Sequence, residues 1–276
     1  MIKCGITGSS GVLGQKLIKK ANFKFVKFRG NISNKNDVNT WIQKNQFDLI
    51  IHLAAIVPTN IVNRNYKIAK KVNYLGTVNL IKSINKYNSN LKWFFFASTS
   101  HVYSINKNLK LLKENSTKKP YTLYGQTKLY AENFIKKNLK KRYKCCIGRI
   151  FSFTDKKQAK YFFIPSMVNK ILTTKNKTVF FKNLSHYRDF ISTDDICSAI
   201  AHLWKKKAVG EYNIASGKKI YLEDLVKLIC KKKKKIPFIA KENHEKTYLL
   251  ANINKIKKTG WKPSKNINNI VADYLS

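Results

Sequence analysis

The first fourteen residues constrain the fold of this chain more than any other stretch. Residues 2–6 form an apolar run, and Gly8, Gly11 and Gly14 follow at intervals of three before a helical pattern begins. Glycine permits a tight turn with positive φ, and the free N–H groups at a helix start attract a pyrophosphate. A strand, a glycine turn and a helix in this order therefore predict a dinucleotide-binding loop. An ordinary glycine-bearing turn is the alternative.

Length and composition limit the kind of protein this chain can be. Its 276 residues suffice for one large α/β domain or for a large and a small lobe, and 43% hydrophobic residues can bury a core. There is no run of about eighteen apolar residues, so we expect no membrane span, and we expect no signal peptide. The five cysteines are odd in number and lack C-x-x-C spacing. These features predict reduced thiols in a cytoplasmic protein, without disulfides or a metal site.

The formal net charge of +41 has two interpretations. It can indicate a polyanionic partner, such as nucleic acid or an anionic membrane surface. It can also reflect a compositional bias toward lysine, asparagine and isoleucine, the residues that an AT-rich coding sequence favours. The lysines are scattered, and the single dense run, 231–235, follows a predicted helix whose C-terminus it complements. We therefore favour the compositional interpretation and expect no nucleic-acid partner.

Apolar runs alternate with helical patterns along the first half of the chain. Strands are predicted over 23–28, 47–55, 91–97 and 143–150, and helices over 37–44, 67–87 and 123–139. This alternation predicts βαβ units and a parallel sheet. The fold class is therefore α/β, a Rossmann-type doubly wound parallel sheet with a smaller C-terminal lobe. We expect the dinucleotide-binding domain over 1–150 and a substrate-binding lobe over 151–276, with some elements returning to the first domain.

A tyrosine and a lysine four residues apart are the first candidates for catalysis. Tyr124 and Lys128 share one face of a predicted helix. An ammonium group beside a phenol favours the phenolate and lowers its pKa from about 10, so such a tyrosine can exchange protons with a substrate. Hydroxyl residues at 98–100 follow a buried strand, at the edge where open α/β sheets bind ligands. A chance pair in a lysine-rich chain and a Ser/Thr-rich turn are the alternatives.

Several motifs together resemble the extended short-chain dehydrogenase/reductases, in the NAD-dependent epimerase/dehydratase group that acts on nucleotide sugars. The resemblance runs nearly end to end, and the order and spacing of the motifs match. They are the T-G-x-x-G-x-x-G loop at 7–14, H-L-A-A at 52–55, N-x-x-G-T-x-N at 73–79, S-T-S-H-V-Y at 98–103, Y-x-x-x-K at 124–128, Y-R-D-F-I at 187–191 with D-D-I at 194–196, and the segments 210–217 and 260–263.

The resemblance implies a set of site residues. Thr99 would be the catalytic hydroxyl, Tyr124 the acid/base, and Lys128 the group that tunes Tyr124 and holds the nicotinamide ribose. Cofactor contacts are implied for Thr7, Gly8, Ser10, Gly11, Val12, Leu13, Gly14, Arg29, Asn31, Ile32, Leu53, Ala54, Ala55, Asn73, Tyr124 and Lys128. Substrate contacts are implied for Thr99, Ser100, Ser152 and Arg188, with Arg188 on the nucleotide diphosphate.

The chain also departs from the family pattern. The segment 15–30 is shorter than is usual in this family, as though part of the second crossover were missing. Arg29 stands where NAD-type members carry an acidic residue for the adenosine ribose, which favours NADP over NAD because an arginine accepts a 2′-phosphate. Asn31 replaces an adenine-contacting aspartate, and Ser152 replaces a substrate-contacting asparagine.

Two further departures bear on the reaction. Ser100 and His101 stand where 4,6-dehydratases carry acidic residues, so we do not expect dehydration. His101 is either an additional acid/base or, as we favour, a histidine packed at the wall of the site. The expected function is an NAD(P)-dependent nucleotide-sugar epimerase or keto-sugar reductase, a homodimer through helices near 67–87 and 123–139. A non-catalytic dinucleotide sensor or RNA-binding protein on the same fold is the alternative.

Overall fold

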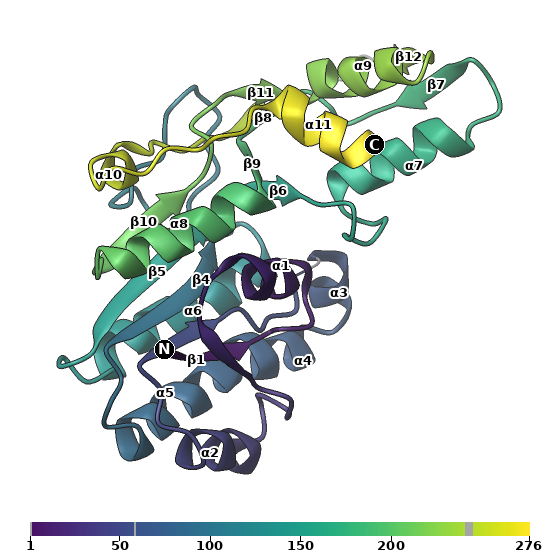
Figure 1. Ribbon diagram of the computed structural model, residues 1–276. Coiled ribbons are helices and arrows are strands. Elements are labelled where there is room, and N and C mark those ends of the chain that lie inside the picture. Colours follow the sequence, from purple (N-terminus) through teal and green to yellow (C-terminus); the bar gives the residue numbers. More distant parts are fainter. Residues whose placement is uncertain (1, 58, 241–244) are drawn as a thin grey trace.

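A six-stranded parallel sheet forms the centre of the molecule (Figure 1). The computed structural model describes residues 2–57, 59–240 and 245–276. The strand order is β10-β5-β4-β3-β1-β2. The bounds are β1 Lys3–Thr7, β2 Lys24–Lys27, β3 Leu49–His52, β4 Trp93–Thr99, β5 Lys144–Ile150 and β10 Gly210–Ile214. Sheet and flanking helices confirm the predicted Rossmann-type fold.

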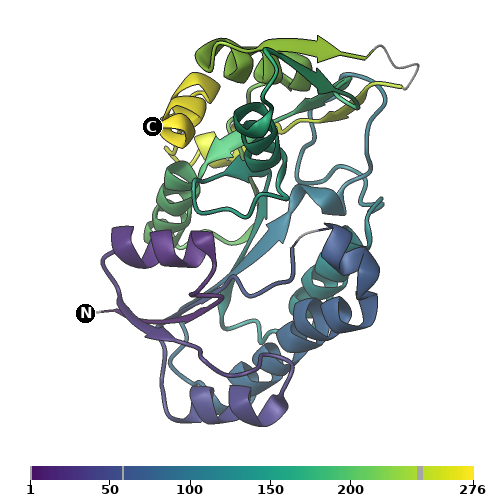
Figure 2. The ribbon, with the colours of Figure 1, turned by 90° about the vertical axis from the view of Figure 1, so that its right-hand side faces the viewer.

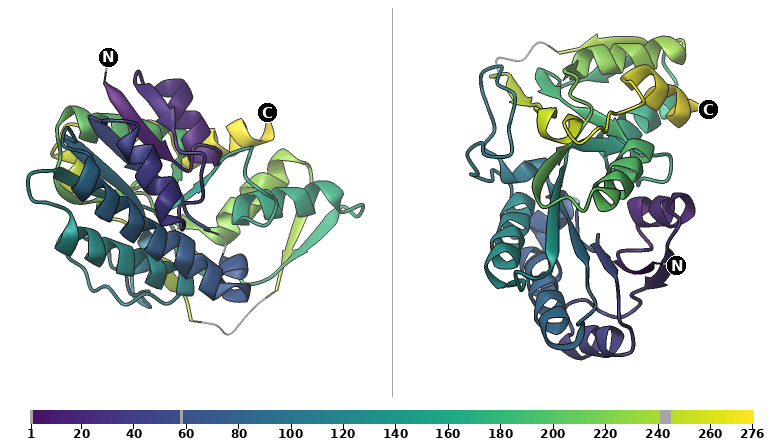
Figure 3. Two further views of the ribbon diagram at one scale, coloured as in Figure 1. Left: turned by 90° about the horizontal axis from the view of Figure 1, so that it is seen from below. Right: turned by 60° about the vertical axis from the view of Figure 1, so that its left-hand side comes forward.

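The central strands are apolar on both faces because helices cover both sides of the sheet. On one side lie α2 (Lys35–Gln43), α5 (Gly76–Tyr87) and α6 (Leu123–Asn138), which pack on Ile50 and Phe94. On the other side lie α1 (Val12–Lys20) and α8 (Thr193–Lys205), which pack on Leu49 and Ile51. Figure 3 shows the sheet between these two layers. Because successive side chains of β3 point to opposite faces of the sheet, they contribute to two separate apolar cores, one on each face.

The predicted helix over 67–87 is interrupted. The segment contains α4 (Tyr66–Lys70), a π-helical turn (Lys71–Leu75) and then α5. Such turns occur mostly as single bulges and often at functional sites. This one carries Asn73 to a fully buried position. A helical pattern in sequence does not reveal the wider turn, because the apolar spacing changes by a single residue.

The two edge strands of the sheet are β2 and β10. On one edge β2 has no further strand beside it in the described chain, which agrees with the short segment 15–30. Exposed Lys24 and Lys27 at its two ends protect this short edge from pairing with other chains. On the other edge β10 pairs in parallel with β5, and α8 joins the helix layer. Both elements come from residues beyond 150.

The remaining C-terminal elements form a smaller lobe at the carboxyl ends of the strands (Figure 2). It has its own apolar core, built from α7, α9 and their neighbours. Three small sheets contribute to it, β11-β8-β13, β12-β7 and β6-β9. The helices of the lobe are α7 Phe163–Thr173, α9 Leu222–Lys232 and α11 Ile267–Leu275, whereas the short α10 Asn254–Lys257 packs on β10 and the core of the central sheet. The strands are β6 Ser152–Thr154, β7 Thr178–Phe181, β8 His186–Arg188, β9 Phe190–Ser192, β11 Ile220–Tyr221, β12 Ile236–Ile239 and β13 Thr247–Leu249.

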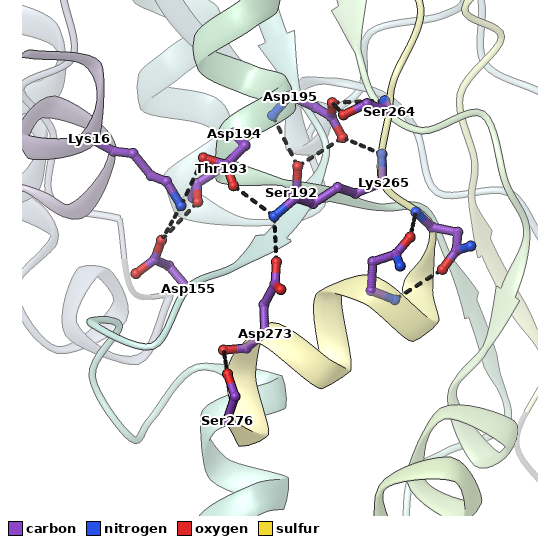
Figure 4. Close-up of polar contacts among 12 residues, drawn as sticks. Lys16, Asp155, Ser192, Thr193, Asp194, Asp195, Ser264, Lys265, Asp273 and Ser276 are labelled. Atoms are coloured by element: carbon purple, nitrogen blue, oxygen red, sulfur yellow. Dashed lines mark hydrogen bonds and ion pairs between the residues drawn. The ribbon is translucent and has the colours of Figure 1, made fainter. Parts of the chain in front are cut away.

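The first turn of α8 joins the small lobe to α1 beside the central sheet (Figure 4). Asp195 is buried and accepts hydrogen bonds from the backbone N–H groups of Ser264 and Lys265, at 2.8 and 3.1 Å. Its neighbour Asp194 forms ion pairs with Lys16 of α1 at 3.1 Å and with Lys265 at 2.9 Å. These two carboxylates therefore connect α1 with the segment that leads into α11.

We expect Asp195→Ala to lower the free energy of unfolding by about 3 kcal/mol, because several buried N–H and hydroxyl donors lose a charged acceptor. Asp273→Ala is the matched control, since it removes a carboxylate that is 58% exposed from Lys265. That surface pair is worth less than about 1 kcal/mol. Urea unfolding of both variants gives the comparison, and equal losses would contradict the assignment.

Candidate active site

Thr99, Tyr124 and Lys128 come together where β4 ends and α6 begins. The Thr122 side chain caps α6 by accepting a hydrogen bond from the Gly125 N–H at 3.0 Å, which fixes Tyr124 in the first turn. A Cβ at Gly125 would lie 2.2 Å from the His101 carbonyl oxygen, so glycine is required for this close approach. The Thr99 hydroxyl then hydrogen-bonds to the Tyr124 phenol. The sequence predicted these residues separately, and the fold joins two of them directly.

The pKa of Tyr124 is shifted in the opposite direction from the one expected. Burial raises the pKa of the phenol above its ordinary value, and the hydrogen bond to Thr99 only partly opposes this. Burial also lowers the pKa of Lys128 to about 7, against the favourable charge of Glu132. The Lys128 ammonium lies 3.9 Å from the centre of the Phe96 ring. The protein alone therefore favours a neutral phenol, because the cost of desolvation exceeds the stabilisation of the phenolate by the Thr99 hydrogen bond.

His101 lies against this pair but does not titrate near neutral pH. Burial and the positive charge of Arg188 lower the pKa of His101 to about 4, so its imidazole stays neutral near pH 7. Its ring stacks on Tyr121 with centroids 5.3 Å apart and meets the edge of Tyr124 at 5.8 Å. His101 is therefore a neutral member of the aromatic wall beside the phenol.

Arg188 reaches this wall from the small lobe. Its guanidinium donates to the Thr247 hydroxyl and carbonyl, both at 3.1 Å, and its charge acts on His101 and Tyr121. Ser100 is buried in the 3-10 turn after β4, and Ser152 is half-buried on β6. Of the predicted substrate residues, Thr99 contacts Tyr124, and Arg188 lies near His101 and Tyr121.

The glycine loop has the geometry that its sequence predicted. Gly8 has φ 69°, and a Cβ there would lie 2.6 Å from the Ala54 nitrogen. A Cβ at Gly14 would lie 2.3 Å from the Gly8 carbonyl oxygen. Gly11 stands at the N-cap of α1 in extended conformation, and no acidic side chain occupies the first helical turn. Close backbone approach and an uncapped helix N-terminus fit a pyrophosphate, so these residues suit a dinucleotide.

The end of β2 carries a carboxylate that the sequence analysis missed. Arg29 is exposed there. Asp37 from the first turn of α2 accepts a hydrogen bond from the Asn31 N–H at 2.7 Å. The Asn31 amide oxygen accepts from the Ser33 N–H and hydroxyl, at 3.0 and 2.7 Å. Asp37 is hard to find from sequence because it lies in a helix after the strand rather than at the strand end.

Asn73 was predicted among the cofactor contacts, and all of its amide atoms have partners inside the protein. Its amide nitrogen donates to the Ile56 carbonyl at 2.9 Å and to the Thr127 hydroxyl at 3.1 Å. Its amide oxygen accepts from the Ile56 N–H at 2.7 Å. The side chain therefore braces the loop after β3 against α6. Ile32 is buried, whereas Leu53, Ala54 and Ala55 are half-buried beside the glycine loop.

A buried ion pair connects α6 to β5 of the central sheet. Glu132 and Arg149 are both fully buried, and the guanidinium donates to the two carboxylate oxygens at 3.0 and 2.7 Å. Ser98 donates to the same carboxylate at 2.5 Å, and Tyr103 accepts from Arg149 at 3.0 Å.

The described residues hold no group of histidines, cysteines and carboxylates arranged for a metal ion. None of the described helices is long and apolar enough to cross a membrane.

We expect Lys128→Met to stabilise the cofactor-free protein by about 2 kcal/mol near pH 7, because it removes a buried ammonium. The folded-state pKa near 7 lies below the ordinary 10.5, so the unfolded chain binds more protons between these values. The wild-type protein therefore gains stability from this group as the pH rises, and the advantage of the variant shrinks toward about pH 10.

Urea unfolding at both pH values measures the effect, with Lys137→Met as an exposed control on the same helix. A Lys128→Met variant that is less stable than the wild type at pH 7 would contradict this prediction.

Comparisons with known proteins agree with this geometry. The family model described as GDP-mannose 4,6 dehydratase matches residues 11–274. A GDP-6-deoxy-D-talose 4-dehydrogenase from Aggregatibacter actinomycetemcomitans is 31% identical over 242 residues, which cover 83% of this chain and 79% of that protein. RMD from Pseudomonas aeruginosa, solved in complex with NADPH, superposes with a TM-score of 0.86 at 20% identity and covers 100% of this chain and 98% of its own.

A UDP-glucose 4-epimerase from Thermus thermophilus, solved in complex with NAD, superposes with a TM-score of 0.83 at 17% identity. The superposition covers 100% of this chain and 99% of that one. At these identities the two solved structures support the fold, whereas the family model and the dehydrogenase identify the family. The chain therefore belongs to the NAD-dependent epimerase/dehydratase family of extended short-chain dehydrogenase/reductases, a family of nucleotide-sugar enzymes.

Proposed function

We propose that this protein is an NAD(P)-dependent keto-sugar reductase, which interconverts a keto group and a hydroxyl on the sugar of a nucleoside diphosphate sugar. The observation that carries the proposal is the buried Tyr124 phenol, hydrogen-bonded to Thr99 and one helical turn from Lys128. A phenol kept neutral by burial is the form that donates a proton to a keto oxygen. The similarity to a GDP-6-deoxy-D-talose 4-dehydrogenase supports redox chemistry at a sugar carbon.

The chain's own residues divide the proton chemistry between them. Thr99 orients the keto oxygen by a hydrogen bond, and Tyr124 gives its proton to that oxygen as the carbonyl becomes a hydroxyl. Lys128, with a pKa near 7, would stabilise the remaining phenolate in its ammonium form, and a proton from solvent then restores the phenol. When bound, the dinucleotide supplies the hydride for the carbon, and the glycine loop at 8–14 together with Lys128 would hold it. Arg188 would bind the diphosphate of the substrate.

Dehydration and epimerisation are less well supported. Eliminating water needs an acid and a base next to Thr99, and Ser100 and a neutral His101 stand there instead. An epimerase must also abstract a proton from a sugar hydroxyl, which needs the phenolate, whereas burial favours the neutral phenol. A non-catalytic sensor or RNA-binding protein has no need for Thr99, Tyr124 and Lys128 in one buried site.

We propose NADP(H) as the preferred cofactor. Arg29 is free to meet a 2′-phosphate at the end of β2, and it lies in a strongly basic chain. The Asp37 carboxylate nearby is held by the Asn31 N–H and opposes this preference in part. The solved relatives carry either cofactor, NADPH in one and NAD in the other.

Native mass spectrometry of the gently purified protein tests the function, followed by titration with NADPH and NADH. The reductase proposal predicts a protein that takes up and releases NADPH freely and oxidises it with a 4-keto nucleotide sugar. One tightly retained NAD per chain would support an epimerase instead. RNA binding that resists salt, without dinucleotide binding, would favour the non-catalytic alternative, because purely electrostatic binding falls steeply with salt.

We expect Tyr124→Phe to reduce kcat by about 10²- to 10⁴-fold, since the variant lacks the proton donor. The dissociation constant for NADPH should stay within about twofold, because the phenol oxygen adds little to ground-state binding. Tyr161→Phe is the control, an exposed tyrosine outside α6 and outside the proposed dimer interface. Turnover of Tyr124→Phe near the wild-type rate would show that another group donates the proton.

We also propose a homodimer through the layer of α4, the π-helical turn and α6. Ile68 and Leu75 are 54% and 42% exposed, and Tyr130 adds a third exposed apolar side chain on α6. Sedimentation should give twice the chain mass of 32.0 kDa. Leu75→Glu should shift the protein to monomer, whereas Leu172→Glu on α7 should not. A monomer in the wild-type protein at micromolar concentration would contradict this assembly.

A further inference from the structure

Both ring nitrogens of His52 form hydrogen bonds inside the domain of the central sheet. It is the last residue of β3 and only 1% exposed. Its Nδ1 lies 2.6 Å from the Thr7 hydroxyl, directly across the β1–β3 pair, and its Nε2 lies 3.0 Å from the Thr77 hydroxyl on α5. The ring packs on Phe96 with centroids 5.6 Å apart. One imidazole thus bridges the strand before the glycine loop and a helix of the covering layer.

The surrounding hydrogen bonds determine which nitrogen carries the proton. The Thr77 hydroxyl donates to the Asn73 carbonyl at 2.8 Å, so it can only accept from His52 Nε2–H. Nδ1 then has a free lone pair and accepts from the Thr7 hydroxyl. The Thr7 oxygen in turn accepts from the Ala54 N–H at 3.2 Å. Every donor and acceptor is matched for the neutral Nε2-protonated tautomer. In the other tautomer, Nε2 would face the Thr77 oxygen with no hydrogen between them, and the Thr7 hydroxyl would lose its acceptor.

The same network continues to the catalytic helix. Asn73, whose carbonyl accepts from Thr77, holds the Thr127 hydroxyl with its amide at 3.1 Å. Thr127 donates to the Tyr124 carbonyl at 2.8 Å. An unbroken series of hydrogen bonds therefore runs from Ala54 and Thr7 beside Gly8 to the turn of α6 that carries the phenol.

We propose that His52 is a positioning residue, which fixes the glycine loop and the proton-donating turn of α6 relative to each other by holding Thr7 and Thr77 in one donor pattern. The inference rests on the proposed function, in which a dinucleotide in the loop must face a sugar held by Tyr124. Its physical basis is that orientation within a few tenths of an ångström controls transfer rates, whereas ring volume alone would only fill space. Around metal sites, a hydrogen bond that orients a functional group is typically worth about 10- to 100-fold in affinity or rate, and we use that scale here.

Direct acid/base chemistry by His52 does not explain its contacts. Burial and the charge of Lys128 lower the pKa of His52 to about 3, so the ring stays neutral at physiological pH. Its nitrogens face two threonine hydroxyls that already have other partners. The ring therefore has no route by which to pass a proton to a substrate.

Nitrogen-15 NMR of histidine in the cofactor-free protein tests the tautomer without any assay of activity. We expect His52 to carry its proton on Nε2 alone. A proton on Nδ1, or on both nitrogens near neutral pH, would overturn the proposal whatever the reaction of the enzyme proves to be.

Variants of Thr77 test the positioning role. Thr77→Val removes the acceptor at nearly constant volume, and we expect the dissociation constant for NADPH to rise about tenfold and kcat to fall about tenfold or more. Thr77→Ser keeps the hydroxyl and should restore both values. Ser83→Ala is the control, because it removes a buried hydroxyl of the same helix that has no hydrogen-bond partner.

The outcomes separate the two proposals. If Thr77→Val matches Ser83→Ala in affinity and rate, His52 only fills space and the positioning role is wrong. If the wild-type protein reduces no keto sugar but Thr77→Val still weakens dinucleotide binding and Thr77→Ser restores it, the proposed reaction fails and the positioning of the loop stands.

Discussion

The buried ion pair between Glu132 on α6 and Arg149 on β5 is the interaction on which the candidate active site depends. Both side chains are fully buried, and removing one partner of such a pair typically costs about 3–5 kcal/mol. Ser98 on β4 donates to the same carboxylate. These contacts fix the position of α6 along β4 and β5. Tyr124 therefore meets Thr99 because the helix that carries it cannot slide along the sheet.

The same burial determines the protonation states in the site. Tyr124 and Lys128 are buried on the inner face of α6, so the pKa of the phenol rises while the pKa of the ammonium falls. Both shifts favour uncharged groups, and the Glu132 charge limits the shift at Lys128. A neutral phenol beside a lysine that titrates near 7 suits the delivery of a proton to a keto oxygen, which is why the proposed function is a reduction.

The charge distribution has a structural pattern. The chain has 14 acidic residues against 55 lysines and arginines. Several of the carboxylates stand where distant segments meet: Asp194 and Asp195 join α1, α8 and the segment before α11, and Glu132 joins α6 to the sheet. Most lysines lie on the surface, as a compositional bias predicts. Negative charge is thus concentrated where the fold needs acceptors, and the positive excess remains on the outside.

The sequence by itself determined the strand–glycine–helix start, the parallel sheet, and the Tyr124–Lys128 pair, because these depend on local periodicity and fixed spacing. It also located Asn73 as important, but not its role as a brace for Ile56 and Thr127. Only the tertiary structure decided the direction of the pKa shifts, the approach of Asp37 to the end of β2, and the arrival of Arg188 beside His101. The physical reason is that burial and charge proximity arise between segments far apart in the chain, which local patterns do not encode.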